Sequence, residues 1–207
     1  YLAQLMTVVN VDALHDSVNY ISAEIGKKHF RELHALYSAS TDNGPYSVNP
    51  QAVGKRRLKT AALRYIQSAD EGDAVRLAAA QYKTATNMTD KVTALAILSD
   101  SATTEREEIF ASFYKEWKND PLVLDKWFSL QAIGDRSDVP ESVSKLTSHP
   151  DFTYKNPNRL RSLIGSFAAG NPKWFHRIDG AGYKLLADTI IKVNGINPST
   201  AARLVTP

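Results

Sequence analysis

NPNRLRSLIGSF, the stretch at residues 156–167, decides the fold class of this chain. Asn156 can cap a helix with its side-chain oxygen, and Pro157 suits the first helical position, where a missing N–H is no loss. The apolar residues that follow recur at steps of three and four positions and form one stripe of a helix: Leu160, Leu163, Ile164 and Phe167. The stretch therefore predicts a capped amphipathic helix.

Two arginines lie beside this stripe. On an ideal helix, Arg159 and Arg161 sit about 100° to either side of the apolar positions. Cations in the first turns of a helix oppose its dipole, at about 0.3–1 kcal/mol each. Either acidic neighbours compensate this cost or the two charges face a cleft, and the stretch itself leaves both possibilities open.

The same capping pattern recurs along the chain. Asn or Asp precedes five of the nine prolines, at positions 50, 121, 157, 172 and 198. Helix starts are predicted near residues 50, 70, 87, 104, 121, 140, 157 and 172, and two such helices make a unit of about 34–40 residues, the period of helical solenoids. Alternating strand patterns are missing. We predict an all-α fold of stacked antiparallel helices, an armadillo- or HEAT-like superhelix, as a single domain over residues 1–207.

The region before residue 50 is predicted as one long helix followed by a loop. Asp12 is the expected N-cap, and apolar residues continue at helical steps from Leu14 to Leu36. Gly26 inside this pattern weakens the helix by up to about 1 kcal/mol and is the expected site of a bend. Residues 40–48 have the composition of a loop.

Composition narrows the class of protein. The chain has 207 residues, 43% of them hydrophobic and 23% charged, which is typical of a folded globular protein. Its net charge of +3 is too small to indicate a nucleic-acid partner by itself. No cysteine is present, so disulfides, thiolate metal sites and cysteine nucleophiles are excluded. No apolar run approaches the length of about 20 residues that spans a bilayer, so we expect no membrane partner.

Known catalytic motifs are missing from the chain. None of the five histidines is four residues from another, and no His-Glu-x-x-His zinc motif occurs. Phosphate-binding loops and the Gly-x-Ser-x-Gly nucleophile elbow are also missing. Gly180-Ala181-Gly182 follows no strand pattern, and we interpret it as a structural turn. From the residues alone we therefore expect no catalytic or metal-binding residue.

Two charged clusters need an explanation. Lys55, Arg56, Arg57 and Lys59 wrap around more than one helix face, which favours a solvated or ion-paired helix surface over a nucleic-acid patch. Asp125 and Lys126 interrupt the most apolar helix, which is predicted to begin at residue 121. Because a buried charge is costly without a partner, we expect partners for this pair among the arginines of residues 156–167.

Several longer strings carry a resemblance to a known family: NMTDKVTALAILSD (87–100), REEIFASFYKEWKNDPLVLDKWFSLQA (106–132), HPDFTYKNPNRLRSLIGSF (149–167), NPKWFHRIDGAGYKLLAD (171–188) and INPSTAARL (196–204). From about residue 50 onward, the chain resembles the C-terminal helical domain of bacterial-type aminopeptidase N. These enzymes are zinc metalloaminopeptidases of the gluzincin class, which remove N-terminal amino acids from peptides. The agreement is weaker before residue 50.

The resemblance implies a four-domain, cytoplasmic parent enzyme. Its catalytic domain would hold zinc through a His-Glu-x-x-His motif and a downstream glutamate, whereas this chain holds no cofactor and is expected to be inactive alone. The chain would cap the catalytic domain of the same polypeptide and wall the cavity that receives peptide substrates. No nucleic acid or membrane partner is implied. The end of the chain at Pro207 is expected to be a truncation.

By the same resemblance, Arg161 and Arg203 face the substrate cavity. A cationic wall would attract peptide carboxylates or backbone carbonyls. The alternative is that both arginines form structural ion pairs. A second hypothesis treats the whole chain as a free-standing helical-repeat scaffold that binds a protein or peptide partner. These alternatives stay open at the level of the sequence.

Overall fold

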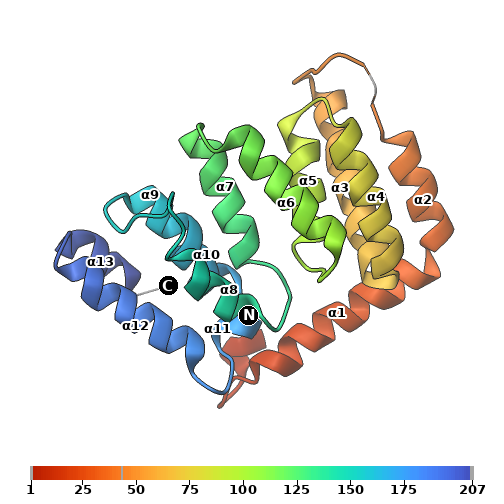
Figure 1. Ribbon diagram of the computed structural model, residues 1–207. Coiled ribbons are helices and arrows are strands. Elements are labelled where there is room, and N and C mark those ends of the chain that lie inside the picture. Colours follow the sequence, from red (N-terminus) through yellow and green to blue (C-terminus); the bar gives the residue numbers. More distant parts are fainter. Residues whose placement is uncertain (1, 43, 206–207) are drawn as a thin grey trace. The chain divides into compact units, whose positions relative to one another are not determined.

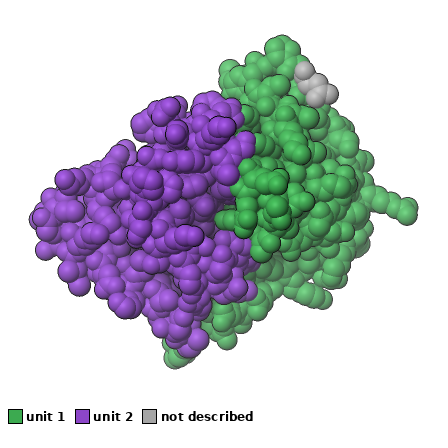
Figure 2. Space-filling view, viewed as in Figure 1, with its two compact units in different colours: residues 1–109 green, residues 110–207 purple. Residues whose placement is uncertain are grey.

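The computed structural model of the chain describes residues 2–42 and 44–205, and every regular element within these ranges is helical. The all-α fold class predicted from the sequence is therefore confirmed. The chain divides into two compact units, residues 1–109 and 110–207, coloured separately in Figure 2. Each unit is described by itself. The prediction of a single domain stays a prediction, because compactness does not test whether a unit folds independently.

Unit 1 is built around one long central helix, α3. Its elements are η1 (Leu2–Leu5), α1 (Val11–Lys28), α2 (Phe30–Ala39), α3 (Pro50–Ala69), α4 (Glu71–Thr84) and α5 (Met88–Leu98). Helix α3 packs against α1, α2, α4 and α5 (Figure 1). Helix α6 (Thr104–Trp117) leads from this unit into the next.

Unit 2 contains shorter helices. They are α7 (Pro121–Ala132), α8 (Val139–Leu146), α9 (Pro157–Leu160), the π-helical segment η2 (Arg161–Gly165), α10 (Ser166–Gly170), α11 (Pro172–Phe175), α12 (Ala181–Asn194) and α13 (Pro198–Leu204). Its core is aromatic and aliphatic, and the largest fully buried side chains from α7 onward are Phe128, Leu160, Leu163, Ile164, Phe167 and Phe175.

Side-chain caps start most of these helices, as the sequence predicts. A side-chain oxygen of the capping residue accepts a backbone N–H at Asn49, Asp70, Asn87, Asp120, Asn156, Asn171 and Asn197. One predicted cap is wrong by two positions. Asn10 caps α1, and Asp12 lies in its first turn. At the start of α6, the Thr103 hydroxyl accepts the backbone N–H of Arg106 at 3.4 Å.

Helices α3 and α5, which are two apart in the chain, run parallel in unit 1. In unit 1, Lys59 and Gln67 of α3 bond to Asp90 and Ile97 of α5, in the same order along both helices. An alternating antiparallel stack produces this relation, because every second helix then points the same way. The hydrogen bonds therefore agree with the predicted stacking.

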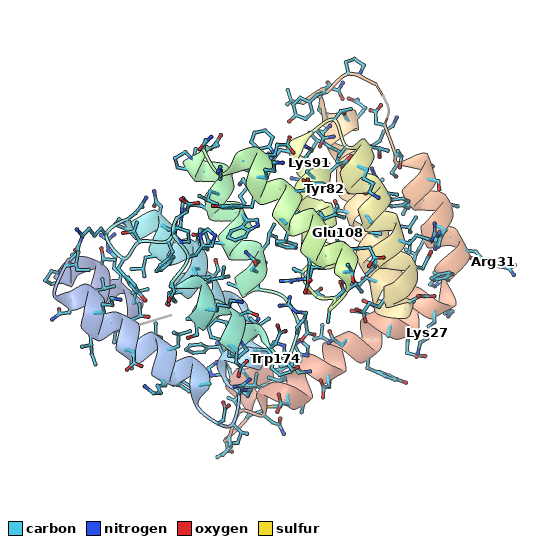
Figure 3. All side chains as sticks on the ribbon, viewed as in Figure 1. Lys27, Arg31, Tyr82, Lys91, Glu108 and Trp174 are labelled. Atoms are coloured by element: carbon cyan, nitrogen blue, oxygen red, sulfur yellow. The ribbon has the colours of Figure 1, made fainter. Side chains whose placement is uncertain are left out.

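Helices α4 and α5 also lie against each other in unit 1. Figure 3 labels one of their contacts, in which Nζ of Lys91 lies 5.6 Å from the centre of the Tyr82 ring. Such a cation over an aromatic face is worth about 0.5–1 kcal/mol at an exposed site.

The long N-terminal helix predicted from the sequence is broken in the structure, at His29 instead of Gly26. Helix α1 ends at Lys28 and α2 begins at Phe30. Gly26 is buried, and a Cβ atom there would lie 2.3 Å from the backbone oxygen of Tyr65. The glycine is thus needed for close packing of α1 on α3, and the predicted bend at this residue is wrong.

A buried ion pair ties α3 to α5. Nζ of Lys59 donates to Asp90 Oδ2 at 3.1 Å, and the two side chains are 6% and 9% exposed. Around the pair, the Tyr37 hydroxyl donates to Gln81, whose amide donates to the backbone oxygen of Asp90. Burial, and then the negative charge of Asp90, raise the pKa of Tyr37 to about 12, so this hydroxyl stays a donor.

The four clustered basic residues of α3, at positions 55, 56, 57 and 59, lie in different environments in the structure. Lys55 and Arg57 are exposed, and Lys59 is ion-paired, as predicted. The prediction of a solvated or ion-paired surface is wrong for Arg56, which is only 9% exposed. Its guanidinium donates to the backbone oxygen of Ser47 at 2.8 Å and so holds the preceding loop on α3.

Within residues 2–42 and 44–205, none of the helices combines the length and the apolar character of a membrane-spanning segment.

Replacing Lys59 by Met should destabilise the protein by about 3–5 kcal/mol, because the carboxylate of Asp90 would stay buried without its partner. Urea unfolding measures this free energy. Lys55→Met is the matched control, since it removes an exposed lysine from the same helix and should change stability by less than about 0.5 kcal/mol. Equal effects of the two substitutions would contradict the assignment of the buried pair.

Candidate functional site

The site begins with a buried ion pair between α7 and α9. Nε of Arg159 donates to Asp125 Oδ1 at 2.5 Å, and the two side chains are 6% and 17% exposed. The guanidinium also donates to the backbone oxygens of Asp151 and Pro121. It lies 5.0 Å from the centre of the Phe128 ring. This arrangement confirms that Asp125 finds its partner among the arginines of residues 156–167.

Asp125 is paired with Arg159 and not with Arg161. Of the two possibilities that the helix-dipole argument left open, the acidic neighbour is the one found for the first arginine. Lys126, in contrast, is exposed and does not need a buried partner. The predicted partner for Lys126 is wrong, because this residue lies on the outer face of α7.

Arg161 begins the π-helical segment that interrupts the predicted helix. The four stripe residues Leu160, Leu163, Ile164 and Phe167 are at most 1% exposed, so the predicted apolar face is confirmed. The helix is not regular, however, since α9 passes through η2 into α10 and ends at Gly170. Such π-helical turns are rare and are often found at functional sites.

Gly165 lets the Arg161 side chain lie along the helix. A Cβ atom at Gly165 would lie 3.0 Å from Cγ of Arg161, which is tighter than ordinary packing allows. Arg161 is exposed, and among the described residues its guanidinium has no ion-pair or hydrogen-bond partner. The charge is thus free to meet a group outside this part of the chain.

Arg203 lies in the last turn of α13, where a cation is favoured by the helix dipole. Asn197 caps this helix by accepting the N–H of Thr200 at 3.0 Å. Arg203 is exposed, and it also has no ion-pair partner within the described chain.

The two arginines line the same cavity of about 520 Å³ in unit 2. Its wall is mostly apolar and comes from α9, α10, α12 and α13, with Leu160, Ala168, Leu186 and Leu204 among its residues. No aspartate or glutamate belongs to this lining. The structure therefore brings together the two residues predicted as substrate-facing, Arg161 and Arg203.

This arrangement suits an anionic group attached to an apolar body. A cavity of this volume is in the range that holds small ligands, and its apolar wall would bury their carbon atoms. A guanidinium binds a carboxylate through two parallel hydrogen bonds, and the low polarity around it strengthens them. A peptide carboxylate fits this chemistry.

Sequence reasoning missed the residues that shape the cavity without carrying charge. Ile133, Gly170 and Leu186 belong to its lining. A Cβ atom at Gly170 would lie 3.1 Å from the Ile133 side chain, so the glycine makes room where α10 passes the end of α7. Gly170 stands directly before the predicted helix start at Asn171-Pro172. This position is the only feature of the sequence that could have pointed to Gly170.

Two further polar contacts anchor the chain that follows α10. The Asn171 amide donates to the backbone oxygens of Ala132 at 3.1 Å and Gly134 at 2.9 Å. The Trp174 indole N–H, labelled in Figure 3, donates to Asp135 Oδ1 at 2.7 Å. The end of α7 is thus fixed to α11, which stabilises the wall of the cavity.

His149 lies in an aromatic cluster next to Arg159. Its ring centre is 5.2 Å from that of Tyr114, 5.3 Å from Trp127 and 5.6 Å from Phe128. Nδ1 accepts the backbone N–H of Asp151 at 3.1 Å. Burial is the main cause that lowers the pKa of His149, with Arg159 acting in the same direction and Asp151 against it.

Among the described residues, no group of three or more His, Cys, Asp or Glu side chains could hold a metal ion.

The two arginines of the 156–167 stretch should respond very differently to substitution. Arg159→Met leaves the Asp125 carboxylate without its buried partner and should lower the free energy of unfolding by about 3–5 kcal/mol. Arg161→Met removes an exposed side chain with no partner and should change stability by less than about 0.5 kcal/mol. Denaturant titration of both variants measures the difference, and a large loss in the second would mean that Arg161 has a structural role.

Acid should weaken the fold through His149. The folded pKa of His149 is lowered, so below the unfolded value of about 6.5 the unfolded chain takes up the proton first. Stability is therefore full above about pH 6.5 and falls as the pH drops from there through the folded pKa. His149→Gln should flatten this dependence in chemical unfolding from pH 7.5 to 5. An unchanged slope in His149→Gln would contradict the assignment.

Comparison with known proteins identifies the family. The whole chain, residues 1–207, matches the family described as "Domain of unknown function (DUF3458_C) ARM repeats". This match confirms the armadillo-like superhelix predicted from the spacing of helix starts.

Its relatives include three bacterial aminopeptidases. The aminopeptidase N of Caulobacter vibrioides is 37% identical over 206 residues, that of Haemophilus influenzae 36% over 205, and that of Escherichia coli 34% over 206. These alignments cover 100%, 99% and 100% of this chain but only 24%, 23% and 24% of the relatives. The chain thus spans about a quarter of their length.

A solved structure agrees with these relatives. The structure of Legionella pneumophila aminopeptidase A in complex with aspartic acid matches with a TM-score of 0.85 at 30% identity, over 98% of this chain and 26% of that one. The resemblance read from the sequence strings is thereby confirmed: the chain belongs to the DUF3458_C family of ARM-repeat proteins and is homologous to the C-terminal helical region of aminopeptidase N.

Proposed function

We propose that this chain is the C-terminal domain of a zinc-dependent aminopeptidase N, where it caps the catalytic domain and walls the cavity that receives peptides. The observation that carries the proposal is the apolar cavity of unit 2. It gathers Arg161 and Arg203 at one site and has no acidic residue in its lining. A wall with two unneutralised guanidinium groups would attract the carboxylates of a peptide.

The alternative role for these arginines, as structural ion pairs, has less support. In the same unit Arg159 is paired and buried, whereas Arg161 and Arg203 are exposed and without an ion-pair partner in the described chain. We infer that Arg161 and Arg203 act on substrate binding.

The remaining parts of the proposal come from the aminopeptidase relatives. They are about four times longer than this chain, so the rest of the polypeptide would supply the catalytic domain and the zinc that activates the attacking water. The proposed enzyme removes N-terminal residues from peptides in the cytoplasm. The 207-residue chain alone would be inactive.

The proposal is tested in the complete polypeptide with three substrates: an aminoacyl-anilide, a tetrapeptide with a free carboxylate and the same tetrapeptide as its amide. Losing a charge-assisted contact of about 1.5 kcal/mol should raise KM about tenfold. Arg203→Ala and Arg161→Ala should therefore raise KM for the free acid about tenfold, with less effect on the amide and none on the anilide.

Arg177→Ala is the matched control, because this arginine of the same unit pairs with Glu141 and Asp179 and does not line the cavity. It should leave all three KM values unchanged. If Arg161→Ala and Arg203→Ala also leave the free-acid KM unchanged, the substrate-facing role is wrong. Zinc-dependent turnover by the 207-residue chain alone would contradict the assignment of catalysis to the rest of the polypeptide.

A further inference from the structure

Helix α3 in unit 1 carries an unbalanced charge. It has five basic residues and no acidic one, in the order Lys55, Arg56, Arg57, Lys59 and Arg64. Two of these cations are used inside the unit, since Lys59 pairs with Asp90 and Arg56 holds the backbone of Ser47. The other three are exposed, and among the described residues their side chains have no ion-pair or hydrogen-bond partner.

Two of the free cations border a groove. Arg57 and Arg64 line a depression of about 490 Å³ on the surface of unit 1. Its apolar lining includes Val48, Val53 and Ala61, and no aspartate or glutamate lies among its residues. The groove thus combines an apolar floor with positive charge that nothing in its wall neutralises.

The loop before α3 builds one side of this groove. Tyr46 and Val48 belong to its lining and are 59% and 74% exposed. The Arg56 guanidinium lies 4.9 Å from the centre of the Tyr46 ring and bonds to Ser47 between the two. The buried arginine therefore fixes the loop in place and keeps two apolar side chains open to solvent.

The spacing along α3 suggests what would bind. Arg57, Ala61 and Arg64 stand at i, i+4 and i+7, on one stripe of the helix, and the two arginines start about 10 Å apart along its axis. In an extended peptide, residues i, i+2 and i+4 share one face and span about 13 Å. The long arginine side chains can close the difference of about 3 Å.

We propose that this groove binds an extended acidic peptide segment in which two carboxylates flank one apolar side chain. The two carboxylates would meet Arg57 and Arg64 through charge-assisted hydrogen bonds. The apolar side chain between them would rest on Ala61, which lies between the two arginines on α3. The segment has the pattern acid, any residue, apolar, any residue, acid.

A nucleic acid fits this surface less well. Single strands are held by a continuous basic track and by aromatic rings on which bases stack. Here Tyr46 is the one aromatic residue of the groove lining, and Arg56 already lies over its ring. The apolar floor between two separated arginines instead matches carboxylates on separate residues.

The direct test is fluorescence anisotropy with the 207-residue chain and a labelled peptide that contains Glu-Thr-Val-Thr-Glu. Its β-branched residues favour the extended form. The matched peptide Gln-Thr-Val-Thr-Gln should bind at least about tenfold more weakly, because it cannot form charge-assisted bonds. A labelled oligo-dT strand is the third probe. If the acidic peptide does not bind, or if the strand binds more tightly than it does, the proposal is wrong.

Two variants locate the binding. Arg57→Gln with Arg64→Gln should weaken binding of the acidic peptide at least about tenfold. Lys28→Gln with Lys83→Gln is the control, because it removes the same charge from two exposed lysines that do not line the groove. Equal weakening by both pairs would show that net charge alone attracts the peptide, which would overturn the assigned site.

The variant Ala61→Glu separates a loss of peptide binding from a loss of folding. Position 61 is exposed, and a carboxylate there would lie four residues after Arg57 and three before Arg64, where ion pairs stabilise a helix. The variant should keep or raise the melting temperature and yet lose peptide binding, because its own carboxylate occupies both arginines. Undiminished binding in this variant would also overturn the proposal. None of these results depends on the aminopeptidase assignment.

Discussion

The buried pair of Arg159 and Asp125 is the interaction on which unit 2 depends. A carboxylate in an apolar helix is tolerated only with a partner of opposite charge and with hydrogen bonds to its remaining atoms. Arg159 supplies the opposite charge and one hydrogen bond to Asp125, and it also donates to two backbone oxygens and lies over the Phe128 ring. Once this arginine is committed to the interior, Arg161 is the one left on the outside, at the wall of the cavity.

The need of a buried charge for a partner also separates the basic residues of unit 1 into buried and exposed ones. Lys59 and Arg56 are drawn inward, one by a carboxylate and one by a backbone oxygen. Arg57 and Arg64 stay outside, in the lining of an apolar groove. In both units a set of basic residues that looks uniform in the sequence separates into cations that hold the fold and cations that are free for a ligand.

Local features of the fold could be predicted from the sequence, and non-local ones could not. Asn and Asp caps act within three residues of themselves, so the starts of α3, α7, α9 and α13 were readable from Asn-Pro and Asp-Pro pairs. The choice of Arg159 over Arg161 depends on a carboxylate 34 residues away. Gly26 could not be assigned either, because its reason is the backbone of Tyr65 on another helix.

The π-helical segment helps to fix the number of residues between Arg159 and Asn171. Two contacts join α7 to the stretch from α9 to the end of α10: Asp125 contacts Arg159, and Ala132 contacts Asn171. The two contacts are therefore seven residues apart on the first segment and twelve residues apart on the second. The π turn, which holds more residues than an α-helical turn, takes up part of this surplus. The segment between the two anchors therefore acts as a spacer of fixed length. Insertions or deletions should be tolerated in the loop before Asn156 but not between Arg159 and Asn171, where one residue more or less would move either the buried pair or the cavity wall out of register.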